Sequence, residues 1–216
     1  MITGIHRAEP RRTKETMYTY RIEQAIRAAT ILHKGQLRKG SAPLPYITHL
    51  FAVTMIASDY TDDEDTLIAA LLHDTLEDTD YTIEELQEDF GGEVRDIVES
   101  ITEPSSTNEQ TLTWKQQKEQ YAKKLKKATE PALIVCAADK IHNMRSIVEE
   151  YYDDHSRFLA EFKGSLEDRA IMYQEISNTL NRLLKNEIIH EFNHVFTEYK
   201  NFLSDVKKSK ENNSKF

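Results

Sequence analysis

The sequence predicts an all-α protein, and three observations indicate this class. Charged residues make up 30% of the 216 residues, whereas Gly and Pro occur only 6 and 5 times. That balance favours helices over the turn-dense strands of a β-sandwich. Apolar residues also recur at spacings of three and four along Ile22, Ala25, Ile26 and Ala29, which places them on one face of a helix. A chain of this length can bury a core, so we expect one helical domain over residues 18–205.

Helix start and stop signals define the first half of this domain. The first helix is expected to begin at Tyr20 and to end at Gly35, and a second begins near Tyr46 after a basic loop over residues 35–45. The third and fourth helices each open on a Thr and a Glu with the spacing of a capping box: Thr61 with Glu64, and Thr82 with Glu85.

Further helices are expected in the second half. The Gly91–Gly92 pair separates the fourth helix from EVRDIVESI, and after a polar loop a helix covers about residues 113–127. We interpret the six lysines of that helix as a solvated face. The run PALIVCAADKIHNMRSIV is apolar and has Pro near its first turn, which predicts a buried central helix. Ser165 with Asp168 opens another helix, and a last one covers about residues 187–205.

Composition and charge exclude several classes of protein. Lys and Arg total 28 against 37 Asp and Glu, and the net charge of -9 argues against nucleic-acid binding because it repels the phosphate backbone. Eighteen uncharged apolar residues never run together, so we expect no membrane span and a cytoplasmic protein. Cys136 is the only cysteine, which excludes an intramolecular disulfide and a thiolate zinc site. A polar segment, residues 1–17, precedes the domain, and the charged ending 206–216 is predicted to be disordered.

The strongest local signal for chemistry is the sequence LLHDTLEDTD. It places His73 beside Asp74, with Glu77 and Asp78 one helical turn later. On a helix, His73 faces the same side as Glu77, and Asp74 shares a side with both carboxylates. Burial of these groups after the apolar run LIAALL is costly without a cation, and mixed imidazole and carboxylate ligands suit Mn²⁺, Fe²⁺ or Zn²⁺. The alternative interpretation is a polar helix end exposed to solvent.

Two other segments supply further candidate ligands. AADKIHNMRS places Asp139 at the end of a buried stretch, where a carboxylate either binds a metal or serves as a helix cap or ion-pair partner. YITHL places His49 inside an otherwise apolar helix, where it either binds a metal or is a hydrogen-bonded core histidine. His33 and His142 flank these motifs, and we interpret both as structural residues or as supports for the ligands.

Together, four segments in this order resemble the hydrolase domain of the RelA/SpoT family, especially its small standalone alarmone hydrolases: HKGQLRKG, PYITHL, AALLHDTLEDT and AADKIHNMRS. The resemblance spans residues 33–146 and implies an HD-superfamily helical bundle with a central metal site. It implies one Mn²⁺ ion per chain, with Fe²⁺ or Zn²⁺ as alternatives, bound by His49, His73, Asp74 and Asp139. It also implies that Glu77 and Asp78 activate the attacking water.

The same resemblance implies how a substrate is held and cleaved. The family reaction removes pyrophosphate from the 3′ position of (p)ppGpp and returns GDP or GTP. Arg38 and Lys39 match positions that contact the guanine base or its phosphates, while Asn143 and Arg145 match residues that line the ribose and phosphate site. Lys140 adds a cation that would help to neutralise a polyanionic substrate. Two departures from the family pattern are the proline-spaced loop GSAPLP, which bears on the base pocket, and Ala-Ala-Asp in place of Leu-Ala-Asp.

Several alternative functions remain open at this point. An HD-family phosphatase acting on another nucleotide or on NADPH would use the same metal site with a different base pocket. A binding module that senses the nucleotide without cleaving it would not need Glu77 and Asp78. The H-E-x-x-H pattern of His190, Glu191 and His194 is typical of zinc peptidases, although an exposed polar helix face explains it more simply. The expected partner is a small-molecule nucleotide, and the sequence predicts no oligomeric state.

Overall fold

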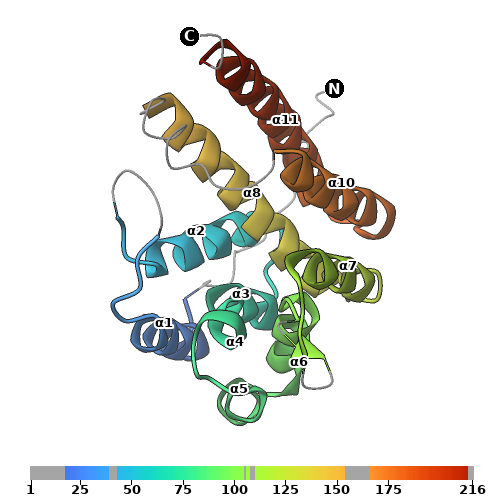
Figure 1. Ribbon diagram of the computed structural model, residues 1–216. Coiled ribbons are helices and arrows are strands. Elements are labelled where there is room, and N and C mark those ends of the chain that lie inside the picture. The colour runs from blue at the N-terminus through green and yellow to red at the C-terminus, as the bar shows by residue number, and fades with distance from the viewer. Residues whose placement is uncertain (1–17, 39–42, 105, 108–109, 154–165, 214–216) are drawn as a thin grey trace, which may run out of the picture.

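A computed structural model of the chain describes residues 18–38, 43–104, 106–107, 110–153 and 166–213. Within them the fold is all-α, as predicted, and the helices follow one another in this order (Figure 1): α1 (Tyr20–Leu32), α2 (Ile47–Ser58), α3 (Glu64–Leu72), α4 (Thr75–Asp78), α5 (Ile83–Phe90), α6 (Gly92–Ile101), α7 (Trp114–Leu125), α8 (Glu130–Asp153), α10 (Leu166–Leu183) and α11 (Ile188–Asn213). The short strands β1 (Ser106–Thr107) and β2 (Gln110–Thr111) pair antiparallel between α6 and α7. None of the helices described here combines the length and the apolar character that crossing a membrane requires.

Helix α8 is the centre of the molecule. It packs against α2, α3 and α6 and also against α10 and α11, so it joins the earlier helices to the C-terminal pair (Figure 1). Every residue from Ala132 to Asp139 is buried, which confirms the predicted central helix. Asp139 is therefore a carboxylate at the end of an apolar run inside the protein, and such a group needs a partner of opposite charge.

The predicted capping box is present at one helix and absent at another. At α5 the Thr82 hydroxyl accepts the Glu85 N–H, and the Glu85 carboxylate accepts the Thr82 N–H, as predicted. At α3 the predicted box that begins at Thr61 is wrong, because Asp63 caps the helix and accepts the N–H of Thr66 at 2.9 Å. A charged carboxylate next to the positive end of the helix is the stronger acceptor at this position.

The end of the chain differs from the sequence prediction. The predicted disordered tail, residues 206–216, is wrong as far as Asn213, because α11 continues to that residue. Val206 is fully buried, so the apolar face of α11 extends past the expected end of the domain. The predicted N-terminal segment 1–17, residues 214–216 and the predicted helix start at Ser165 lie outside the described residues.

Candidate metal and catalytic site

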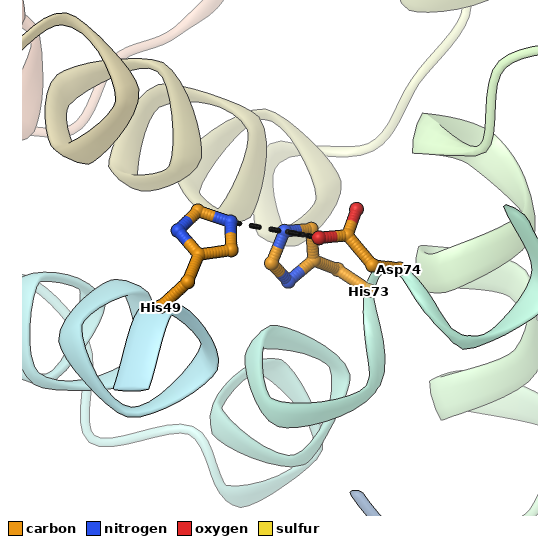
Figure 2. Close-up of side chains that lie close together, drawn as sticks. All are labelled: His49, His73 and Asp74. Atoms are coloured by element: carbon orange, nitrogen blue, oxygen red, sulfur yellow. Dashed lines mark ion pairs between the residues drawn. The ribbon is translucent and has the colours of Figure 1, made fainter. Parts of the chain in front are cut away.

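Segments that are far apart in the sequence bring the four predicted metal ligands together. His49 lies in the first turn of α2, His73 and Asp74 lie at the junction of α3 and α4, and Asp139 lies in α8. Figure 2 shows the rings of His49 and His73 and the carboxylate of Asp74 turned toward one another. Three separate parts of the helical bundle therefore contribute to one cluster.

The junction between α3 and α4 explains why two adjacent residues serve the same cluster. In a continuous helix, neighbouring side chains point about 100° apart. The prediction of one helix through His73 and Glu77 is wrong, because α3 ends at Leu72 and α4 is a separate turn that begins at Thr75. His73 and Asp74 lie between the two helices, and their side chains approach within 3.2 Å of each other.

The candidate ligand atoms are close enough to share one ion. Nε2 of His73 lies 3.2 Å from Oδ2 of Asp74 and 3.7 Å from Oδ1 of Asp139. Nε2 of His49 lies 3.2 Å from Oδ1 of Asp139 and 3.5 Å from Oδ2 of Asp74. Atoms that each lie about 2 Å from a common ion are roughly 3–4 Å apart, so these separations fit a single metal site.

Polar contacts behind the two histidines hold their rings in position. The Nδ1–H of His73 donates to the carbonyl of Ala70 at 2.8 Å, so Nε2 is the nitrogen that faces the carboxylates. Nδ1 of His49 lies 2.8 Å from Nδ1 of His142, which agrees with the interpretation of His142 as a support for a ligand. Burial and the neighbouring His49 lower the pKa of His142 to about 4, so His142 is neutral at pH 7. Such outer contacts fix the tautomer and the direction of a metal-binding imidazole.

The charges of the cluster favour a bound cation. Burial disfavours ionisation of Asp74 and Asp139, yet the pKa of each is held below its usual value, by His73 next to Asp74 and by Lys140 next to Asp139. The pKa of His73 is raised against the effect of burial, chiefly by Asp74. Nε2 of His73 is also buried without a hydrogen-bond partner among the described residues, although carboxylates lie nearby. Two carboxylates and an orphaned imidazole nitrogen are a donor set that fits a divalent transition metal.

Glu77 lies beside the cluster rather than in it. One cavity is lined by His73, Asp74, Asp139, Glu77 and Lys140, among other residues. Burial of the carboxyl group and the charge of Asp74 raise the pKa of Glu77 to about 7, against the effect of a hydrogen bond from the Glu103 N–H. Much of the side chain is nevertheless exposed, so solvent has access to this group. A carboxyl group with a pKa near 7 beside a metal site is suited to moving a proton.

Asp78, the other member of the predicted catalytic pair, is less well placed than Glu77 to act on a water in the cavity. Its side chain is exposed and does not line the cavity that contains Glu77 in the described part of the chain. Burial and the charge of Asp74 raise the pKa of Asp78. Its backbone carbonyl accepts a hydrogen bond from Gln36 Nε2 at 2.7 Å, which ties α4 to the segment after α1.

Three of the predicted substrate-binding residues lie at the edge of the cluster. Arg38 Nη2 donates to Oδ1 of Asn143 at 2.9 Å, and Asn143 Nδ2 donates to Oδ1 of Asp139 at 2.5 Å. Lys140 Nζ lies 2.7 Å from Oδ2 of Asp139. These contacts place two cations next to the candidate metal site. Lys39, another of the five predicted residues, lies outside the described residues.

Arg145 and the H-E-x-x-H segment contact each other away from the cluster. The Arg145 side chain is 48% exposed, and its Nη1 lies 2.7 Å from Oε1 of Glu191. The side chains of His190 and His194 are 77% and 73% exposed, and each lies near a glutamate three or four residues away in the sequence. The only three-residue metal cluster among the described residues is at His49, so the structure gives no support to the peptidase interpretation.

Sequence reasoning did not identify two groups that act on the site. The Tyr46 hydroxyl donates to Oδ2 of Asp74 at 2.6 Å, and the Tyr46 ring stacks on His33. Tyr46 lies three residues before His49, and this spacing could have indicated from the sequence that Tyr46 lies near the site. Glu103 acts through its backbone N–H, which donates to Oε1 of Glu77 at 2.6 Å. Any residue except proline can make such a backbone contact, so the residue type at position 103 does not indicate it.

Comparison with known proteins agrees with the geometry of the site. Residues 25–163 match the family model described as HD domain. The guanosine-3′,5′-bis(diphosphate) 3′-pyrophosphohydrolase MESH1 of Xenopus tropicalis is 34% identical over 158 residues, which cover 67% of this chain and 86% of that protein. The GTP pyrophosphokinase of Streptomyces coelicolor is 38% identical over 137 residues, which cover 62% of this chain but only 15% of that much longer protein.

A solved structure supports the fold independently. It is described as a metazoan ortholog of SpoT that hydrolyzes ppGpp, and it superimposes with a TM-score of 0.67 at 24% sequence identity. The match covers 85% of this chain and 98% of that one. Nearly the whole of the solved domain is therefore present here as the same helical arrangement.

Proposed function

Because this chain belongs to the HD domain family and aligns with most of a small alarmone pyrophosphohydrolase, we propose that it hydrolyses the 3′-pyrophosphate of (p)ppGpp. One observation supports this proposal above the others. Three of the four proposed ligands, His73, Asp74 and Asp139, line one cavity together with Glu77, and the fourth, His49, lies against Asp139 at 3.2 Å. We further propose a cytoplasmic enzyme that acts on a nucleotide and binds no nucleic acid, in keeping with the net charge of -9.

We assign the ligand roles to His49, His73, Asp74 and Asp139. Two imidazoles and two carboxylates suit Mn²⁺, and Fe²⁺ and Zn²⁺ are accepted by similar donor sets. A divalent ion in this site would lower the pKa of a bound water and offset negative charge on a phosphate oxygen. One ion per chain is expected, because the described residues contain one such cluster.

The protein's own groups supply the remaining chemistry. Water attacks the phosphorus bonded to the ribose 3′ oxygen, and the bond between that phosphorus and the 3′ oxygen breaks. The 3′ oxygen takes up a proton from solvent, and the products are GDP or GTP and pyrophosphate. Glu77 takes the proton of the attacking water, since it lines the cavity and its pKa of about 7 suits proton transfer at neutral pH. Asp78, one residue further along α4, is assigned a supporting role in the same acidic pair.

The cations at the edge of the cluster would bind the substrate. Arg38 and Lys140 lie beside Asn143 and Asp139, where they can neutralise phosphate charge that this acidic protein otherwise repels. Lys39 is proposed to act with Arg38 on the base or its phosphates. Arg145 pairs with Glu191, so a phosphate contact by Arg145 requires that it leave this partner.

Hydrolysis of ppGpp by the purified protein tests the proposal directly. The protein is stripped with a chelator, reloaded with Mn²⁺ and incubated with ppGpp, and chromatography identifies the products. GDP and pyrophosphate are expected, and their formation should stop when the metal is removed again. Release of single phosphates, or turnover of NADPH without turnover of ppGpp, would instead favour the HD-family phosphatase.

A further inference from the structure

Glu77 is anchored by the segment that joins α6 to α7. Its Oε1 accepts the backbone N–H of Glu103 at 2.6 Å. Its Oε2 has no hydrogen-bond partner within the described residues, while the side chain lines the cavity that contains the ligand cluster. One carboxylate oxygen is thus fixed in direction, and the other is left to accept a proton from water.

Two lysines of α7 hold this segment in place. Lys118 Nζ lies 2.5 Å and 2.6 Å from the two carboxylate oxygens of Glu103. Lys124 Nζ donates to the carbonyl of Thr102, the preceding residue, at 3.2 Å. The side chains of Lys118 and Glu103 are only 21% and 23% exposed, so solvent screens their attraction less than it screens a surface ion pair.

The other lysines at this end of α7 behave differently. Lys123, Lys126 and Lys127 are exposed, as the interpretation of a solvated face predicts. For Lys118 and Lys124 that interpretation is wrong, because both side chains turn toward the α6–α7 segment. Burial lowers the pKa of Lys124, which agrees with its partly enclosed position.

We propose that Lys118 is a positioning residue for the general base. Its ion pair with Glu103 fixes the backbone N–H that orients the Glu77 carboxylate, and this inference rests on the proposed function of the site. Lys118 does not line the cavity, so its effect on the reaction passes through Glu103. A general base displaced by about 1 Å can lose on the order of 10²-fold in rate, so even a small shift of this segment has a measurable effect.

Replacement of Lys118 tests this role against two matched variants of the same helix. Lys118→Met should lower kcat by roughly tenfold, with KM and metal content unchanged, because only the direction of the base is disturbed. Lys118→Arg keeps the ion pair and should recover most of the loss. Lys123→Met removes an exposed lysine of α7 and should match the wild type. A raised KM with an unchanged kcat would show that Lys118 binds substrate, which would overturn the proposal.

A double-mutant cycle with Glu103→Ala shows whether the effect passes through Glu103. The double variant should be no slower than the slower single variant, because each change releases the same segment. The pH profile gives a second readout. Since the Glu103 N–H lowers the pKa of Glu77, its loosening should move the acid limb of the pH profile of kcat to higher pH in Lys118→Met, which keeps the Glu103 carboxylate.

The outcomes distinguish this inference from the proposed function. The charged groups that face Glu77, namely Asp74, Glu103, Lys124 and Lys140, remain in Lys118→Met, so a shifted acid limb reports the position of Glu77. Multiplicative losses in the double variant, or an unshifted limb, would overturn the positioning role while wild-type hydrolysis stands. Absence of hydrolysis by the wild type would overturn the proposed function itself.

Discussion

Among single residues, Glu77 is the side chain whose loss should separate catalysis from metal binding. It lines the cavity but does not belong to the cluster of His49, His73 and Asp74. Glu77→Gln should therefore retain the metal and lose about 10²–10⁴-fold in kcat, the usual contribution of a general base. An amide nearly matches a carboxylate in volume, so the fold should persist. Metal analysis beside steady-state rates checks this, and a metal-free Gln variant would identify Glu77 as a ligand instead.

The pKa of Glu77 also determines how the rate depends on pH. Burial raises this pKa to about 7, so Glu77 is protonated below that pH and cannot accept a proton. The rate constant kcat should rise with increasing pH and level off once Glu77 is ionised. A cation in the neighbouring site favours the carboxylate, so the midpoint in the loaded enzyme should lie at or below about 7. A profile that is flat from about pH 5 to about pH 9 would exclude Glu77 as the base.

At the scale of helices, the break between α3 and α4 is the element that sequence patterns did not reveal. The run LIAALLHDTLED contains no Gly or Pro and keeps a helical period. At the break, side chains bond to backbone carbonyls of α3: His73 Nδ1 donates to Ala70, and Thr75 Oγ1 donates to Leu72. Such side-chain bonds are an alternative to the helical ladder. The candidate ligands could be identified from residue type, whereas the break that lies between them and these local bonds could not.

Thr75 should therefore affect both stability and metal binding. Its side chain is fully buried, and its hydroxyl donates to the Leu72 carbonyl at 2.6 Å. Thr75→Val keeps the shape and removes the donor, which should destabilise the protein by about 1–2 kcal/mol and weaken metal affinity through the loosened junction. Urea unfolding and metal titration measure the two effects. Thr30→Val removes a similar bond at an exposed position of α1, so this variant should leave metal affinity unchanged.

At the scale of the whole molecule, the sequence predicted the helices and the residues of the candidate metal site, but it did not predict the long-range pairings. Apolar periodicity identified α1, an unbroken apolar run identified α8, and the family motifs identified the residues that meet at the candidate metal site. The partner of Arg145 could not be read from one sequence, because Glu191 lies far along the chain in α11. Tyr60 donates to the same glutamate, so this carboxylate links three parts of the fold. The helical end of α11 was missed because the apolar positions become sparse there, although Val206 is buried.

The ligand set joins α2, the α3–α4 junction and α8, so metal binding should stabilise the whole molecule rather than one loop. A ligand that binds only the folded state at 100 times its Kd contributes about 2.7 kcal/mol of stability. For a chain of this size, each kcal/mol raises Tm by about 2–4 °C, so Mn²⁺ should raise Tm by roughly 5–10 °C and a chelator should reverse the change. Thermal unfolding with and without Mn²⁺ measures this shift. His73→Ala removes a buried ligand and should abolish most of the shift, whereas His190→Ala, at an exposed histidine of α11, should retain it. An equal shift in His73→Ala would place the stabilising ion somewhere other than this cluster.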